Sequence, residues 1–284
     1  MAKLLDPKLD FIFKNIFGNK TTTNVLISLL NAVICYNKKS KKIKSVIIED
    51  SFIKKENLED KYAVLDIKAT LDDDTKVDIE IQIVDQYNME QRSLYYLSRL
   101  YSEQLNEGDE YKNLKRAITI NILNFNLIKN DRYHNHYLLK EYETNEIFSE
   151  LLQVHTIELQ KFHKRADEIT DDLESWVEFL KEPNEEVVEM LSERVPEINE
   201  AFQILKVVSR DEYTRRDAEI RAKALSDKAS NLAGAEEKGR KEGRKEGRKE
   251  EQIKIARNLL KNGIDIDIIA TTTGLSKEEI QAQR

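Results

Sequence analysis

The stretch VLDIKATLDDDTKVDIEIQIV (64–84) contains two runs in which apolar and polar residues alternate, separated by an acidic turn. In a β-strand, residues two apart share a face. The first run places four apolar residues on one face, and the second run does the same: Leu65, Ile67, Ala69 and Leu71, then Val77, Ile79, Ile81 and Ile83. The stretch therefore predicts an antiparallel hairpin with one apolar and one polar face.

The polar face of this hairpin carries the chemically informative side chains. If both apolar faces meet the same core, cross-strand partners must share a face, which restricts the register. We expect Asp66 to pair with Gln82 across a three-residue loop, 73–75. That register brings Asp66, Glu80 and Gln82 to one side of the hairpin.

Two carboxylates on one strand face repel each other unless a cation lies between them. Mg²⁺ is bound by one or two carboxylates together with water and substrate phosphate, and a bound divalent ion can activate water for phosphodiester hydrolysis. The pattern therefore favours a metal site with Asp66 and Glu80 as ligands and Gln82 orienting water or a phosphate oxygen. The alternative is an ordinary hairpin with a solvated face of mixed charge.

Periodicity along the rest of the chain predicts an α/β or α+β core with one mixed sheet over residues 1–165. Asp6 and Pro7 are typical of the start of a helix that Gly18 ends. The other expected elements follow in chain order: a helix at 22–35, strands at 44–53, 61–71 and 76–84, a helix at 86–107 closed by Gly108, strands at 116–125, 133–143 and 150–159, and helical structure from 170 to 250 with Trp176, Phe179 and Leu180 buried.

The C-terminal third divides into three expected parts: a helical extension (166–235), a charged spacer (236–250) and a helical tail (251–284). The spacer contains GRKEGRKEGRKE (239–250), which is consistent with a solvated helical or flexible segment, a basic arm on DNA, or a helix–helix contact along its glycines. In the tail, Ser276 and Glu279 form a capping-box pattern after a Thr-Gly turn. This order resembles a helix-turn-helix, although its last helix is acidic, so protein association is an equal alternative to DNA binding.

Composition removes several classes of function. The 284 residues carry a net charge of −7, with no run of 18 apolar residues and no secretory h-region at the N-terminus, so a cytoplasmic protein without membrane contact is expected. The single cysteine, Cys35, fits a buried position in a reducing compartment. Phosphate-loop, dinucleotide and serine-nucleophile motifs are absent from the sequence. His134 and His136 could share a metal, and five lysines between 38 and 44 could contact phosphate or simply be solvated.

The pattern of Asp66 followed by Glu80-Ile81-Gln82 resembles the core motif of PD-(D/E)XK nucleases, in a form that has glutamine in place of the lysine. Four segments together resemble the recombination-promoting nuclease, transposase-like family: DPKLDFIFKNIFG (6–18), LDIKATLDDDTKVDIEIQ (65–82), QRSLYYLSRLYSEQLNEGDEY (91–111) and the tail beginning EQIKIARNLLKNG (251–263). The resemblance implies a restriction-endonuclease-like fold and Mg²⁺- or Mn²⁺-dependent DNA cleavage that promotes recombination or acts against phage.

Carried over to this sequence, the resemblance implies that Asp66 and Glu80 bind metal and that Gln82 occupies the position of the catalytic lysine. It further implies Asp10 as an additional ligand. Four residues are expected to line the cleft or contact DNA: Arg92, Tyr96, Lys68 and Lys14. Leu65 stands where the motif has proline, and the missing lysine charge must come from elsewhere, with Lys68 as one source.

Each of these helical residues also has a purely structural interpretation. Arg92 could form a surface ion pair, Tyr96 could pack on an amphipathic helix, and Asp10 with Lys14 could be an ordinary helix pair. DNA is the expected partner, and the C-terminal region is expected to form a homo-oligomer. The competing function is a catalytically weak or inactive DNA-binding or assembly protein that retains the nuclease fold.

Overall fold

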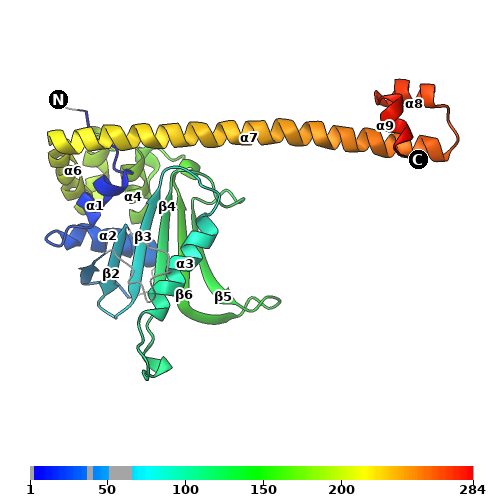
Figure 1. Ribbon diagram of the computed structural model, residues 1–284. Helices are drawn as coiled ribbons and strands as arrows, with labels where there is room; N and C mark the ends of the chain where they lie inside the picture. The colour runs from blue at the N-terminus through cyan, green and yellow to red at the C-terminus, as the bar shows by residue number, and fades with distance from the viewer. Residues whose placement is uncertain (1–2, 37–40, 51–65, 284) are drawn as a thin grey trace. The chain divides into compact units, whose positions relative to one another are not determined.

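The computed structural model describes residues 3–36, 41–50 and 66–283, and within them a six-stranded mixed sheet forms the centre (Figure 1). The strand order is β1-β2-β3-β4-β6-β5. The strands are β1 (Val46–Glu49), β2 (Ile67–Leu71), β3 (Lys76–Gln82), β4 (Ala117–Leu123), β5 (His134–Lys140) and β6 (Ile147–Glu158). β3, β4 and β6 are parallel, whereas β1, β2 and β5 run antiparallel to their neighbours. The expected mixed sheet is confirmed, and residues 51–53 and 61–65 of the predicted strands lie outside the described residues.

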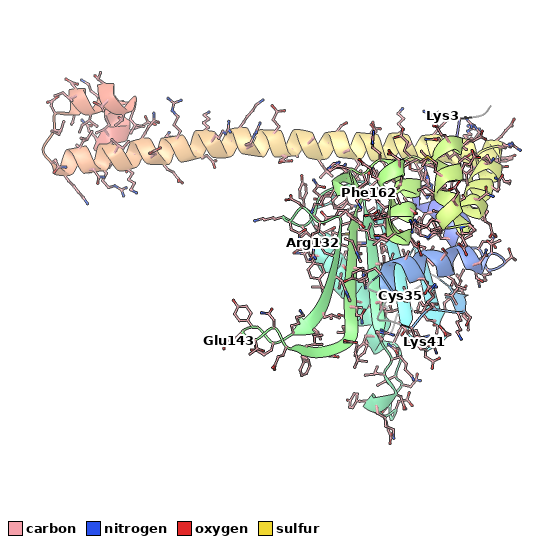
Figure 2. The ribbon with its side chains drawn as sticks, turned by 180° about the vertical axis from the view of Figure 1, so that it is seen from behind. Lys3, Cys35, Lys41, Arg132, Glu143 and Phe162 are labelled. Atoms are coloured by element: carbon pink, nitrogen blue, oxygen red, sulfur yellow. The ribbon has the colours of Figure 1, made fainter. Side chains whose placement is uncertain are left out.

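Helices cover both faces of this sheet. α3 (Met89–Ser102) lies in front of β3, β4 and β6 in Figure 1, while α2 (Thr23–Ile34), which ends next to Cys35, lies on the opposite face seen in Figure 2. The helices that pack with α2 are α1 (Asp10–Phe17), α4 (Asp172–Lys181) and α6 (Glu197–Val208), with α5 (Glu185–Arg194) against α4 and α6. This is an α/β core with a mixed sheet, as the sequence pattern predicts, and it has the restriction-endonuclease-like architecture that the family resemblance implies.

The core occupies the α2 side of the sheet because the hairpin's apolar face points there. Ile67, Ile79 and Ile81 are buried within one cluster that also contains Trp176 and Phe17. The Phe17 and Trp176 rings meet edge to face with centroids 5.4 Å apart. Burying such side chains is the main source of stabilisation, about 25 cal/mol per Å² of apolar surface. The predicted burial of Trp176, Phe179 and Leu180 is confirmed.

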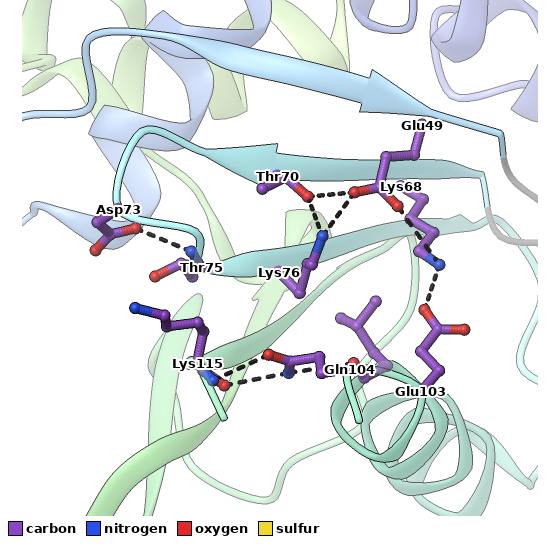
Figure 3. Close-up of polar contacts among 10 residues, drawn as sticks. Glu49, Lys68, Thr70, Asp73, Thr75, Lys76, Glu103, Gln104 and Lys115 are labelled. Carbon is purple, nitrogen blue, oxygen red and sulfur yellow. Dashed lines mark hydrogen bonds and ion pairs between the residues drawn. The ribbon is translucent and has the colours of Figure 1, made fainter. Parts of the chain in front are cut away.

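Two helix ends differ from the sequence prediction. α1 begins at Asp10 rather than at Pro7, because Asp6 forms a turn of its own in which its carboxylate accepts the Lys8 N–H at 2.9 Å. α3 ends at Ser102, well before Gly108. The chain turns there because the Gln104 amide bonds both backbone groups of Lys115, at 2.9 and 3.1 Å (Figure 3).

The hairpin register also differs from the prediction by one pleat. Lys68 pairs with Asp78, so Asp66 lies opposite Glu80 instead of Gln82, and the loop is Asp72–Asp74. Asp74 adopts a φ of 64°, a left-handed conformation that Asp tolerates better than most residues. Because the shift is two residues, the polar and apolar faces are those predicted.

The chain divides into two compact units, Met1–Ser226 and Asp227–Arg284. α7 (Glu212–Lys261) begins in the first unit, and the second contains α8 (Ile266–Thr273) and α9 (Lys277–Gln281) around a small core of Ala256, Ile269, Leu275 and Ile280. Gly239, Gly243 and Gly247 lie inside α7, and a Cβ added at any of them would meet no described atom within 4 Å. This favours the solvated helical interpretation of the repeat over a glycine-lined helix contact within the chain. The four-part division made from the sequence stays a prediction.

In the part of the chain that the structure describes, no helix is both long and apolar enough to cross a membrane.

Candidate active site

Asp66 and Glu80 lie side by side on the sheet face under α3. The Asp66 backbone N–H donates to Glu80 Oε1 at 3.3 Å, and the Ile81 N–H donates to Asp66 Oδ2 at 2.9 Å. Asp66 is 8% exposed and Glu80 is fully buried. Each carboxylate is thus oriented by the backbone of the other strand, which is possible only in the register observed.

Burial and mutual repulsion perturb both carboxylates. Burial raises the pKa of Glu80 to about 7, and the negative charge of Asp66 adds to this rise, while Arg92 opposes it. Burial also raises the pKa of Asp66, against the lowering effects of the Ile81 hydrogen bond and of Lys14. Strongly perturbed pKa values of this kind concentrate at functional sites.

Two of the predicted cleft residues approach the carboxylate pair from different helices. Arg92 on α3 donates from Nη2 to Glu80 Oε2 at 2.5 Å, with its guanidinium 5.2 Å from the centroid of the Tyr96 ring. Lys14 on α1 places Nζ 3.8 Å from Asp66 Oδ1. Arg92, Tyr96 and Lys14 therefore gather at the site, and the ion pair of Arg92 is with Glu80 rather than with a surface carboxylate.

Asp10 is held by another helix. Arg221 Nη1 lies 3.0 Å from both Asp10 oxygens, and its Nε pairs with Asp217 at 2.9 Å. Asp10 is still close enough for its charge to raise the pKa of Asp66. In the observed arrangement its carboxylate is neutralised by Arg221.

Lys68 lies on the same face as Asp66 but is engaged elsewhere. Its ammonium pairs with Glu103, directly after the last residue of α3, and with Glu49 on β1, the latter at 3.6 Å (Figure 3). Glu49 also accepts from Lys76 at 2.9 Å and from Thr70. The ion pairs of Lys68 therefore link β1, β2 and the end of α3. Lys14 lies next to Asp66 instead.

Gln82 occupies the end of β3 on the face that carries Glu80. It is half-buried, it pairs with Leu123 of β4, and its carbonyl accepts the Asn124 N–H at 2.9 Å. Its position on the face agrees with the sequence pattern, and its catalytic role stays a prediction.

Three further polar residues under α3 were not selected from the sequence. Asp78, fully buried, accepts the Thr119 hydroxyl at 3.0 Å, and burial together with Glu80 raises its pKa well above the usual range. Ser93 and Asn121 bond to each other at 2.9 Å. The alternating pattern placed Asp78 on the polar face, but only the packing of α3 reveals its depth, and no local signal marks Ser93 or Asn121.

The predicted histidine pair belongs to a different cluster on the α2 face. His134 Nε2 lies 3.0 Å from His155 Nδ1, and the His136 ring stacks on His155 with centroids 4.1 Å apart. Burial lowers the pKa of all three rings, most strongly that of His155. The three rings stack on one another, and their lowered pKa values favour the neutral forms. Within the described ranges, no group of three or more His, Cys, Asp or Glu is arranged to hold a metal.

The donor set at Asp66 and Glu80 fits a hard divalent cation of the Mg²⁺ type. Such an ion takes one or two protein carboxylates and completes its shell with water and substrate phosphate, so a third protein carboxylate is not required. Burial and the mutual repulsion of the two carboxylates raise the pKa of Glu80, and burial raises that of Asp66, so a cation between them would stabilise both charged forms. Asp66 and Glu80 are therefore the residues that would hold the ion.

Comparison with family models identifies the class of protein that this fold and site define, a PD-(D/E)XK nuclease. Residues 7–235 match the model described as PD-(D/E)XK nuclease family transposase, and residues 249–284 match the Rpn/YhgA-like nuclease family C-terminal HTH domain. The chain belongs to the PD-(D/E)XK nuclease family transposases. Comparisons with curated proteins and with solved structures gave no significant match.

Proposed function

We propose that this protein is a divalent-metal-dependent DNA endonuclease whose active site is the Asp66–Glu80 pair. The observation that carries the proposal is the buried cross-strand pair of carboxylates with Lys14 and Arg92 beside it. Membership in the nuclease family supports phosphodiester hydrolysis, and the helix-turn-helix match supports DNA as the substrate.

Each residue of the proposed site has a separate role in cleavage. Asp66 and Glu80 would hold Mg²⁺ or Mn²⁺. When bound, the ion would stabilise negative charge on the scissile phosphate and lower the pKa of a water molecule. Arg92 orients Glu80, and the Tyr96 ring packs against the guanidinium. Lys14, close to Asp66, supplies the positive charge that glutamine at position 82 lacks. Gln82 positions the water or a phosphate oxygen.

Plasmid nicking with Mg²⁺, with Mn²⁺ and with EDTA tests this proposal. We expect nicking with either metal and none with EDTA, and loss of nicking in Asp66→Asn and Glu80→Gln. Glu143→Gln, at the tip of the β5–β6 hairpin (Figure 2), is the matched control and should cut at the wild-type rate. Equal nicking by wild type and both site variants would reject the site.

A second function is favoured by one observation, the glutamine at position 82. In that case the protein binds DNA without cutting it and acts as an assembly module. DNA binding without cleavage in either metal, on supercoiled, linear and single-stranded DNA alike, would establish it.

The biological role belongs to the same proposal. We propose that cleavage promotes recombination or limits phage, in a cytoplasmic homo-oligomer assembled through the C-terminal region. Recombination frequency and plaque counts in cells that express wild type or Asp66→Asn test the role. Light scattering of the full chain tests the oligomer.

A further inference from the structure

A pocket of about 320 Å³ opens beside α3 on the sheet face that carries Asp66 and Glu80. Its walls are mainly apolar, and Tyr137 and Leu94, which are 41% and 58% exposed, line it. Its volume is at the lower end of the roughly 300–1,000 Å³ typical of ligand pockets. Nothing in the catalytic roles given to Asp66, Glu80, Arg92 and Lys14 uses this pocket.

The pocket lies one strand away from the candidate metal ligands. Asn121, which lines it, pairs with Glu80 in the β3–β4 register, and neighbouring strands are about 4.8 Å apart. Consecutive residues of α3 connect the two places, since Arg92 bonds Glu80 and Ser93 bonds Asn121. The pocket and the carboxylate pair therefore lie on neighbouring strands beneath the same helix.

Asn121 presents a hydrogen-bond acceptor without a partner. Its Nδ2 donates to Ser93 Oγ at 2.9 Å and to the His155 carbonyl at 3.4 Å. Because a carbonyl can only accept, the nitrogen must face His155, and Oδ1 is the remaining atom. Oδ1 is buried without a partner among the described residues, in a side chain that is 1% exposed. A buried acceptor of this kind is costly unless a ligand donates to it.

The charges around the pocket indicate which part of a nucleotide it accepts. The described residues that line it include no lysine, arginine or histidine, and Glu90 is the charged one. This environment disfavours a phosphate and suits a flat, neutral group with an N–H donor. Bases that leave the stack are held by stacking on aromatic or apolar side chains and by hydrogen bonds to their edges.

We infer that this pocket binds one unstacked base of the DNA substrate, next to the phosphate that is cut. The inference rests on the proposed endonuclease function and deepens it. Tyr137 and Leu94 contact the faces of the base, and Asn121 Oδ1 accepts one of its N–H groups. Because a paired base inside a duplex cannot reach the pocket, the preferred substrates are DNA with single-stranded, mismatched or bulged nucleotides.

The test measures binding of the full-length protein in EDTA, where no cleavage occurs, to a 30-mer duplex and to the same duplex with one unpaired base. Fluorescence anisotropy gives both affinities. Wild type should prefer the unpaired base, and Tyr137→Ala and Leu94→Glu should reduce that preference roughly five- to 100-fold, the range expected for loss of one base–aromatic stack. Tyr142→Ala and Ser98→Glu are matched controls, because both side chains are exposed and neither lines the pocket.

Equal wild-type affinity for the two duplexes, or an unchanged preference in both pocket variants, would overturn the inference. The same holds if the wild type does not bind DNA at all. Failure of the proposed function would give a different result. The wild type would prefer the unpaired base and the pocket variants would lose this preference, but the wild type would not nick DNA in Mg²⁺ or Mn²⁺. That result would retain the base pocket and reject the endonuclease.

Discussion

At the scale of single residues, the lysine beside the carboxylate pair comes from a helix and not from the strand that carries Glu80. Lys14 comes from α1 and lies 3.8 Å from Asp66, whereas position 82 on β3 holds glutamine. We expect Lys14→Ala to lower the nicking rate about 100-fold, which is the usual effect of removing one group that stabilises charge in the transition state. Single-turnover nicking at saturating metal measures it.

Two variants complete the test of Lys14. Lys14→Arg should recover part of the rate because it restores the charge. Lys20→Ala, which removes an exposed lysine near the same helix, should not change it. A wild-type rate in Lys14→Ala would show that the charge comes from elsewhere.

Asp78 is a fully buried carboxyl on the same strand as the candidate metal ligand Glu80. Burial and the charge of Glu80 raise the pKa of Asp78 well above the usual range, which favours the neutral acid. We expect Asp78→Asn to change the free energy of unfolding by less than about 1 kcal/mol, because a neutral group of similar shape replaces it. Urea denaturation at pH 7 measures this, and a loss of several kcal/mol would show that Asp78 is ionised.

His134 predicts a dependence of stability on pH. Burial and His136 lower its pKa to about 4 from an ordinary value near 6.5. Since the unfolded chain takes up the proton first, the stabilisation is complete above pH 6.5 and is lost as pH falls toward 4. The loss amounts to at most about 3 kcal/mol.

The matched comparison for this pH effect is His134→Gln. Urea denaturation from pH 4 to 8 should give a flatter curve for the variant than for wild type between pH 4 and 6.5. Parallel curves in that window would contradict the assignment. The comparison is needed because the raised pKa values of Glu80 and Asp66 act in the opposite sense, reducing stability as pH rises.

At the scale of secondary structure elements, the glycines of the tail separate into two kinds. Gly243 lies inside α7, where an added Cβ would have no described atom within 4 Å, whereas Gly274 ends α8 at a φ of 74°. We expect Gly243→Ala to stabilise the helix by up to about 1 kcal/mol. Gly274→Ala should destabilise the second unit by about 1 kcal/mol, because alanine is strained at positive φ.

Amide hydrogen exchange measures both glycine variants on the same chain. Protection of α7 around residue 243 should rise in the first variant, and protection of α8 and α9 should fall in the second. Opposite signs for the two substitutions are the essential outcome. Equal effects would mean that α7 is not helical around the repeat in solution.

The same scale explains what could be predicted from the sequence. Alternation in 64–84 determined which residues share a face, so Asp66 and Glu80 were found without a structure. The register was off by one pleat because both registers keep the apolar faces together, and the loop conformation at Asp74 selects between them. The local pattern therefore determines which strand face a residue occupies, but not which residue it pairs with on the neighbouring strand.

Partners between distant segments were the part that the sequence could not supply. Arg221 is 211 residues from Asp10, and its bond to that carboxylate follows only from the packing of α7 on α1. Lys68 likewise meets Glu103 and Glu49 because three elements converge there. Asn121 is one of two polar residues, with Thr119, in the otherwise apolar β4, and its unpaired oxygen depends on the position of α3.

At the scale of the whole molecule, the two family matches fall largely on different units of the chain. Most of the nuclease match and the whole candidate site lie in the first unit, and the helix-turn-helix match lies in the second. The second unit has its own small core, in which Ile280 is fully buried. We therefore expect DNA affinity and cleavage chemistry to be separable by substitutions.

Ile280→Asp tests this separation without shortening the chain. A charge in the small core should unfold the second unit, because burying an unpaired carboxylate is strongly unfavourable. We expect at least a 10-fold weaker affinity for duplex DNA and a smaller dependence of binding on salt, since fewer phosphates are contacted. The rate of metal-dependent nicking at saturating protein should stay within about threefold, because Asp66 and Glu80 are untouched.

Glu278→Gln, exposed on α9, is the control for folding. Unchanged affinity in Ile280→Asp, with the second unit shown to be unfolded by hydrogen exchange, would assign DNA binding to the first unit alone.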